Sequence, residues 1–301
     1  LGLLPGTRVG ASLIDAHAGG VGTIGGLTDR LAYIMGTSAC IMATTEAPHF
    51  VPGIWGPYFS GMVPGLWLNE GGQSAAGAGI DHLVRSHPAY PELAASAARA
   101  GIDPLEFLER GILARVDAPG KAAWLARDLH VLPDFLGNRS PYADPGARAV
   151  ISGLDLDADR ESLERLFVAG LSGLAYGLAE VIEVMQAHEM RARLMVMSGG
   201  ASRSALVRQI MADTTGLTVA LPATAEPVLL GSAMLGAVAA GTYPSLRAAM
   251  EHMSGLGALT AATPPALARF HAAKRKVYAA MRRLEAESRT VMGTLEEPPC
   301  C

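Results

Sequence analysis

Apolar residues along this chain recur in two spacings, one typical of buried strands and the other of helices. Short continuous apolar runs predict strands, at 9–14, 31–35, 39–44, 193–197 and 218–221. Helical spacing predicts helices, at about 73–85, 159–190, 204–215, 229–240 and 265–292. Because strands come first and then alternate with helices, the pattern predicts an α/β domain with a mixed sheet.

The segments between these elements differ in character. Residues 48–64 are rich in Pro, Gly and aromatic residues, which predicts an ordered loop. Residues 86–129 are Ala-rich and punctuated by prolines, which predicts a helical insertion. Residues 130–149 predict a rigid loop, in which an ion pair between Arg139 and Asp144 is one way of bracing the chain.

Composition narrows the classes of partner. The 301 residues are 50% hydrophobic, enough for a sizeable core. Lys and Arg number 24 against 28 Asp and Glu, without blocks of like charge, so we expect neither a nucleic-acid nor a membrane partner. Neither disulfide nor metal spacing is found among the three cysteines, and no signal peptide is recognised, so a cytoplasmic location is expected. Two of those cysteines, Cys300 and Cys301, fall in a tail that we expect to be disordered.

The first candidate for chemistry is Asp15, which follows the apolar run 9–14. A carboxylate at the carboxyl end of a strand lies where α/β sheets commonly expose their sites. It could act as a general base on a hydroxyl or as a ligand of Mg²⁺. An Asx turn or a helix N-cap is the structural alternative, and local sequence alone favours it.

Two glycine-containing turns are candidates for binding a nucleotide. Gly36, Thr37 and Ser38 lie between two predicted strands. Their hydroxyls and backbone N–H groups could converge on a phosphate, or the segment could be an ordinary hairpin turn. Gly199 and Gly200 separate a predicted strand from a predicted helix. Backbone N–H groups there can approach a ligand closely, and the dipole of the following helix favours phosphate.

One further glycine pattern is discounted. Gly20, Gly22 and Gly25 have the spacing of a dinucleotide-binding fingerprint. That fingerprint requires a strand directly before it and a long helix directly after it, and residues 15–19 and Gly26 break this context. A nicotinamide-dependent oxidoreductase is therefore a weak alternative.

Four segments, in this order and spacing, resemble the C-terminal half of the FGGY carbohydrate kinases. They are DAHAG at 15–19, GTS at 36–38, GNRSPYADPGARAVISGL at 137–154 and SGGASRS at 198–204. The likeness runs from about residue 5 to 260, and residues 48–84 look like the ribulokinase-type branch, which includes D-ribulose kinases. It implies an actin-like ATPase (ribonuclease H-like) lobe at 1–260 with the helical insertion at about 86–129, then a C-terminal helix and tail at 261–301.

The resemblance also implies roles for individual residues. Asp15 matches the catalytic aspartate that takes the proton from the sugar's primary hydroxyl, although Ala16 stands where relatives often have Gln. The turn at 36–38 matches the one that holds the ATP phosphates. The other nucleotide-binding positions are matched by glycines, by an aspartate and by a serine where many relatives have Asn: Gly77, Asp81, Gly199, Gly200 and Ser204.

The implied function is ATP- and Mg²⁺-dependent phosphorylation of a ketopentose, with D-ribulose favoured, giving the 5-phosphate and ADP. The residues that hold the metal are not identified. Alternatives are another FGGY kinase acting on L-ribulose, ribitol or xylulose, and a non-catalytic actin-like ATP-binding module. We expect an N-terminal sugar-binding lobe outside this chain, without which the chain is inactive, and we allow for a homodimer.

Overall fold

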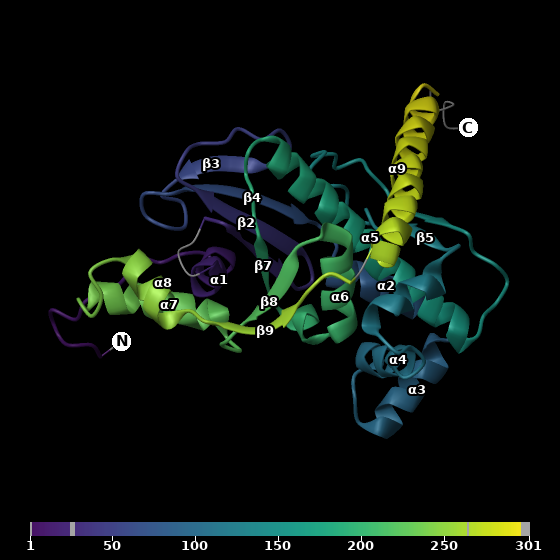
Figure 1. Cartoon of the computed structure of the whole chain (residues 1–301), viewed down its shortest axis with the longest axis horizontal. Coiled ribbons are helices and arrows are strands. Elements are labelled where there is room, and N and C mark those ends of the chain that lie inside the picture. The colour runs from purple at the N-terminus through teal and green to yellow at the C-terminus, as the bar shows by residue number, and fades with distance from the viewer. Residues whose placement is uncertain (1, 25–27, 264, 296–301) are drawn as a thin grey trace, which may run out of the picture.

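A mixed sheet with antiparallel strands at both edges organises the chain (Figure 1). The computed structural model describes residues 2–24, 28–263 and 265–295. The sheet order is β3-β4-β2-β1-β7-β8-β9, and β1, β7 and β8 run parallel. Its strands are β1 (Arg30–Met35), β2 (Ala39–Thr45), β3 (Trp55–Phe59), β4 (Trp67–Gln73), β7 (Leu194–Ser198), β8 (Thr218–Pro222) and β9 (Leu256–Thr260). A separate small sheet pairs β5 (His130–Leu132) with β6 (Val150–Ser152).

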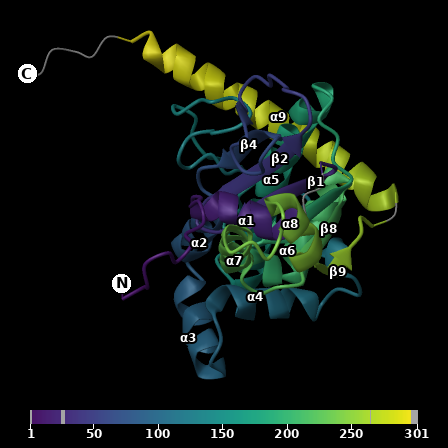
Figure 2. The ribbon, with the colours of Figure 1, turned by 90° about the vertical axis from the view of Figure 1, so that its left-hand side faces the viewer.

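Helices cover both faces of the large sheet, because alternate residues of its strands point to opposite sides (Figures 1 and 2). One face packs against α1 (Asp15–Ile24), α7 (Pro227–Ala239) and α8 (Leu246–Met253). The other packs against α2 (Gly77–Ser86), α5 (Arg160–Ala187) and α6 (Ala205–Thr215).

The remaining helices lie outside these two layers. The predicted insertion is α3 (Tyr90–Ala100), α4 (Pro104–Leu113) and a 3₁₀ helix at Pro119–Ala126, and a second 3₁₀ helix spans Gly200–Arg203. The C-terminal helix α9 (Pro265–Gly293) lies across α5, α6 and β5. The α/β class predicted from the sequence is confirmed.

The central helix α5 is long and apolar enough to cross a membrane by composition. However, 83% of its most apolar window is buried inside the protein. Its N-terminus is capped by Asp159, whose carboxylate accepts from the N–H of Ser162. We therefore assign α5 as the core helix of the domain.

Glycines allow α1 and α7 to pack backbone against backbone. A Cβ at Gly22 would lie 2.0 Å from the Pro227 carbonyl oxygen, and one at Gly231 would lie 1.9 Å from the Ala18 oxygen. Gly20 and Gly22 are thus buried inside a helix, and residues 2–14 before it form no strand, which agrees with discounting the dinucleotide fingerprint. Its third glycine, Gly25, lies outside the described residues.

Several boundaries predicted from the sequence are wrong. Residues 9–14 pair with no described strand, and Val9 and Ile14 are exposed, so Asp15 begins a helix instead of ending a strand. The expected loop at 48–64 contains β3. The helix expected from 73 begins at Gly77, because residues 67–73 form β4 between β2 and β3. The predicted tail with Cys300 and Cys301 lies outside the described residues.

Candidate functional site

The turn between β1 and β2 is held in place by the first residues of α2. The carbonyl of Gly36 accepts from the N–H of Gly77 at 2.9 Å, and that of Thr37 accepts from Ala76 and Ala78 at 2.9 and 3.1 Å. A Cβ at Gly77 would lie 2.6 Å from the Gly36 oxygen, so only glycine permits this approach. The outer side of the turn is free to meet a ligand, since Gly36 and Thr37 are exposed and Ser38 is half-buried.

The second glycine turn lies beside the same end of β1. Gly199 has φ +90°, and a Cβ there would lie 2.4 Å from the Met35 carbonyl oxygen. The N-terminus of α6 that follows is already capped, because Ser204 Oγ accepts from Val207 N and Glu109 Oε1 accepts from Leu206 N. The expectation of a phosphate at this helix N-terminus is therefore not supported.

A cavity of about 740 Å³ opens where these segments meet. Four residues singled out from the sequence contribute to its walls: Gly36, Gly77, Gly200 and Ser204. Its apolar walls come from α2, α5, α6 and the insertion, through Ile80, Leu105, Leu113, Phe167, Leu171 and Val207. A largely apolar pocket with a few placed polar groups, opening at a glycine turn, suits a nucleoside bound with its phosphates toward that turn.

Two predicted nucleotide residues have other contacts. The Asp81 carboxylate accepts from Arg85 at 2.6 Å on the outer face of α2, and Asp81 is not part of the cavity wall. Ser204 does line the cavity, but its hydroxyl caps α6. The structure therefore brings Ser204 to the cavity and leaves Asp81 outside it.

Asp15 lies at the same end of the sheet as the phosphate turn. One helical turn after it, a Cβ at Gly19 would lie 2.9 Å from Cδ1 of Ile34, near the end of β1. Asp15 also acts on Cys40, which follows the turn at the start of β2. The pKa of the Cys40 thiol is raised first by burial, then by the Glu70 carboxylate and to a smaller extent by that of Asp15. An exposed carboxylate beside the turn can take a proton from a hydroxyl placed there.

Sequence reasoning gave no place in the site to three polar side chains on this side of the sheet. His17 on α1 and Glu70 on β4 pair at 3.2 Å, and the Glu70 side chain is only 12% exposed. Arg139 acts on the same thiol as Asp15 and Glu70, and opposes the rise of the Cys40 pKa. The predicted Arg139–Asp144 pair is wrong, because Asp144 pairs with Arg289 on α9. Knowing that residues 67–73 form a strand would have placed Glu70 on the face of α1.

Oxygen donors suited to Mg²⁺ are available near the turn. Across the described ranges, no three His, Cys, Asp or Glu side chains cluster as a protein-only metal site requires. The carboxylate of Asp15 and the hydroxyls of Thr37 and Ser38 are hard oxygen donors. These groups would suit a Mg²⁺ ion, whose charge would offset that of nucleotide phosphates.

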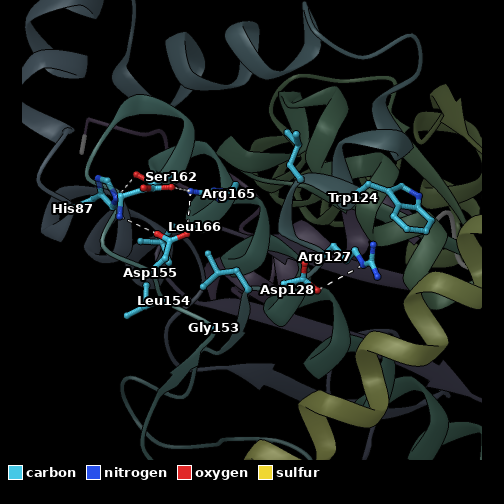
Figure 3. Close-up of a pocket in the computed structure, with 13 residues that line it drawn as sticks. His87, Trp124, Arg127, Asp128, Gly153, Leu154, Asp155, Ser162, Arg165 and Leu166 are labelled. Carbon is cyan, nitrogen blue, oxygen red and sulfur yellow. Dashed lines mark hydrogen bonds and ion pairs between the residues drawn. The ribbon is translucent and has the colours of Figure 1, made fainter.

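A second cavity, of about 360 Å³, lies away from these residues, between α5 and the segment at 153–157 (Figure 3). His87 Nε2 lies 3.2 Å from Ser162 Oγ there, and burial lowers the pKa of His87. Arg165 pairs with Asp155 and Asp157. These charges are engaged with one another and fasten the segment to α5, so we assign this cavity no role in the site.

Comparison with known proteins agrees with this arrangement. The profile of the FGGY family of carbohydrate kinases, C-terminal domain, matches residues 31–240. An FGGY carbohydrate kinase domain-containing protein of Xenopus laevis is 42% identical over 98% of this chain and 56% of its own length. A D-ribulokinase of Saccharomyces cerevisiae is 36% identical over 82% of this chain and 38% of its own length.

Solved structures show the same fold. A xylulose kinase from Rhodospirillum rubrum matches with a TM-score of 0.68 at 23% identity, covering 88% of this chain and 49% of the other. A glycerol kinase from Plasmodium falciparum, solved with ADP, matches with a TM-score of 0.60 at 18% identity, covering 94% of this chain and 51% of the other. This chain spans about half the length of the curated relatives it matches. With its fold, its glycine turns and the matched profile, the chain belongs to the FGGY family of carbohydrate kinases, whose C-terminal domain it contains.

Proposed function

We propose that this chain is the ATP-binding lobe of a kinase that phosphorylates a ketopentose at its primary hydroxyl, giving the 5-phosphate and ADP. The observation that carries the proposal is the convergence of Gly36, Gly77 and Gly200 at one cavity, with Asp15 at the same end of the sheet. Similarity to several ribulokinases favours ribulose as the substrate, and similarity to a D-ribulokinase favours its D isomer.

Each part of the arrangement has a task in phosphoryl transfer. The cavity takes the adenosine, and the turn at 36–38 holds the β- and γ-phosphates through N–H groups and hydroxyls. Mg²⁺, when bound with the nucleotide, supplies neutralisation of phosphate charge. Asp15 accepts the proton of the attacking hydroxyl, a contribution worth roughly 10²–10⁴-fold in rate. Positioning and charge supply most of the remaining catalysis.

Binding of a sugar requires residues beyond those that this chain provides. Asp15 is exposed beside the phosphate turn, and relatives are about twice as long as the chain. We infer that a second lobe completes the sugar site and closes over it, so that the 301-residue chain alone has little or no turnover. A non-catalytic ATP-binding module is the competing function, in which Asp15 would serve only the N-terminus of α1.

The test is an ADP-release assay with Mg·ATP and a panel of sugars. The panel holds D-ribulose, L-ribulose, xylulose and ribitol, and a two-lobed form of the protein is run beside the 301-residue chain. Turnover on D-ribulose by the two-lobed form alone supports the proposal. Preference for another sugar would change the proposed substrate and leave the proposed kinase activity unchanged. ATP binding without turnover on any sugar favours the non-catalytic module.

A further inference from the structure

Arg139 is a cation near the site, and the mechanism proposed above assigns it no role. Within the described ranges Arg139 takes part in no ion pair, and it is half-buried beside the Cys40 thiol. Its guanidinium carbon lies 5.4 Å from the ring centroid of Trp55, which holds the group from one side. An unpaired guanidinium fixed in a site is a ready receptor for an anion with planar oxygen geometry.

The loop that carries Arg139 is rigidly attached to β4. On one side, Asn138 and Asp144 exchange backbone hydrogen bonds of 2.8 Å, and Asn138 Nδ2 donates to Asp134 at 3.2 Å. On the other side, Ser140 Oγ accepts from the N–H of Gly72 at 3.3 Å. The residues on both sides of Arg139 are thus fixed by hydrogen bonds, so the backbone position from which its side chain extends is fixed as well.

Gly72 makes room for the guanidinium on the sheet. Arg139 Nη1 lies 3.1 Å from the place where a Cβ at position 72 would stand. Gly72 pairs directly with Cys40, and Glu70 pairs with Met42, so these residues share the face covered by α1. Arg139 therefore lies over the pair Cys40–Gly72, on the same face as the Glu70–His17 pair.

The strand register places this group between the two halves of the site. Ser38 of the phosphate turn comes two residues before Cys40, and Glu70 comes two residues before Gly72. Two residues of strand span about 7 Å, so Arg139 lies roughly midway between the turn and Glu70. A phosphoryl group moving from a nucleotide at the turn to a hydroxyl beside Asp15 and Glu70 passes this position.

We propose that the Arg139 guanidinium binds the phosphoryl group in transit, which makes it a further catalytic residue of the reaction proposed above, on which this inference rests. The hydroxyl oxygen of the sugar bonds to the γ-phosphorus, and the bond from that phosphorus to the bridging oxygen breaks, its electron pair leaving with ADP. The hydroxyl proton goes to Asp15. Arg139 exchanges no proton and stabilises the charge on the equatorial oxygens.

The experiment compares Arg139→Gln and Arg139→Lys with wild type in a two-lobed form of the protein. In Arg139→Gln we expect kcat to fall about 100-fold or more, as when one transition-state donor is lost. Affinity for the non-hydrolysable analogue AMP-PNP should fall about tenfold, with ADP affinity within about twofold, since a charge-assisted bond to the γ-phosphate is lost. Arg139→Lys should recover part of kcat, because it keeps the charge but not the planar fork.

Arg127→Gln is the matched control, because it removes one positive charge from an exposed residue that is 3.7 Å from Asp128. It should behave as wild type. A kcat of Arg139→Gln within threefold of wild type overturns the inference and leaves the proposed function standing. Equal losses of ADP and AMP-PNP affinity with a lower Tm overturn it as well, since they indicate a structural role. If wild type phosphorylates no sugar, the proposed function fails, and the ratio of AMP-PNP to ADP affinity alone decides whether Arg139 meets the γ-phosphate.

Discussion

At the scale of single residues, Gly77 shows how closely the phosphate turn and α2 depend on each other. The first N–H groups of α2 are satisfied by the carbonyls of Gly36 and Thr37, so the helix begins on the turn itself. Substitution of Gly77 therefore disturbs stability and ligand binding together. Gly200 lines the same cavity but has open space around it.

We predict that Gly77→Ala lowers the free energy of unfolding by about 1–3 kcal/mol, because a Cβ would press on the Gly36 carbonyl oxygen at 2.6 Å. Chemical denaturation measures the change. Gly200→Ala is the control, and its stability should stay within about 0.5 kcal/mol of wild type. Equal stabilities of the two variants would mean that the turn and α2 are not coupled as described.

At the scale of helices, α1 and α7 depend on glycines in the same way. Gly22 faces the backbone of α7 at Pro227, whereas Gly236 on α7 is exposed. Both are helical glycines, so they differ in what surrounds them and not in their backbone.

Opposite effects on stability are expected from alanine at these two positions. Gly22→Ala should destabilise by about 1–3 kcal/mol, because its Cβ would meet the Pro227 oxygen at 2.0 Å. Gly236→Ala meets no atom within 4 Å, and should stabilise by up to about 1 kcal/mol through helix propensity. Thermal melts of both variants decide the matter, and a loss of stability in Gly236→Ala would show that α7 is packed differently.

Elements were predictable from sequence where one periodicity dominates, as in β1, β7 and α5. β4 was missed because WLNEGGQ lacks the period-2 alternation of a strand, its two apolar residues being followed by polar residues and glycines, and it becomes a strand by pairing with β2 and β3. Because β4 was not predicted, Glu70 and Arg139 could not be assigned to the site from the sequence. The strand predicted at 9–14 is the opposite error, because this apolar segment pairs with no described strand. The glycine turns were predictable as turns from local sequence, whereas the roles of these turns and of Asp15 were implied by the resemblance to the FGGY kinases and stay predictions.

At the scale of the whole molecule, α9 joins the C-terminal end of the chain to the core. His271 on α9 is 2% exposed, and its Nδ1 lies 3.0 Å from the hydroxyl of Tyr176 on α5. Arg282 on α9 pairs with Asp134 at 2.8 Å, at the base of the loop that carries Arg139. The packing of α9 therefore helps to fix the position of the loop that carries Arg139.

The pH dependence of stability should report on this packing. Burial lowers the pKa of His271 from 6.5 to about 4 in the folded state. Between these values the unfolded chain binds a proton that the folded chain does not, so stability falls as pH falls from 6.5 to 4. This group alone accounts for about 3 kcal/mol.

His271→Gln removes the titration and keeps a polar partner for Tyr176. The wild-type curve of unfolding free energy against pH should be steeper than the variant's between pH 4 and 6.5, and the two should run parallel above pH 7. Parallel curves throughout would mean that His271 is accessible to protons in the folded protein.

In the proposed mechanism, nucleotide binding and proton removal are divided between the cavity and Asp15. Asp15→Asn tests this division in a two-lobed form of the protein, through its turnover with Mg·ATP and D-ribulose and its dissociation constant for ATP. We predict that kcat falls by about 100-fold or more while ATP affinity stays within a few-fold. Unchanged turnover in Asp15→Asn would remove Asp15 from the chemistry.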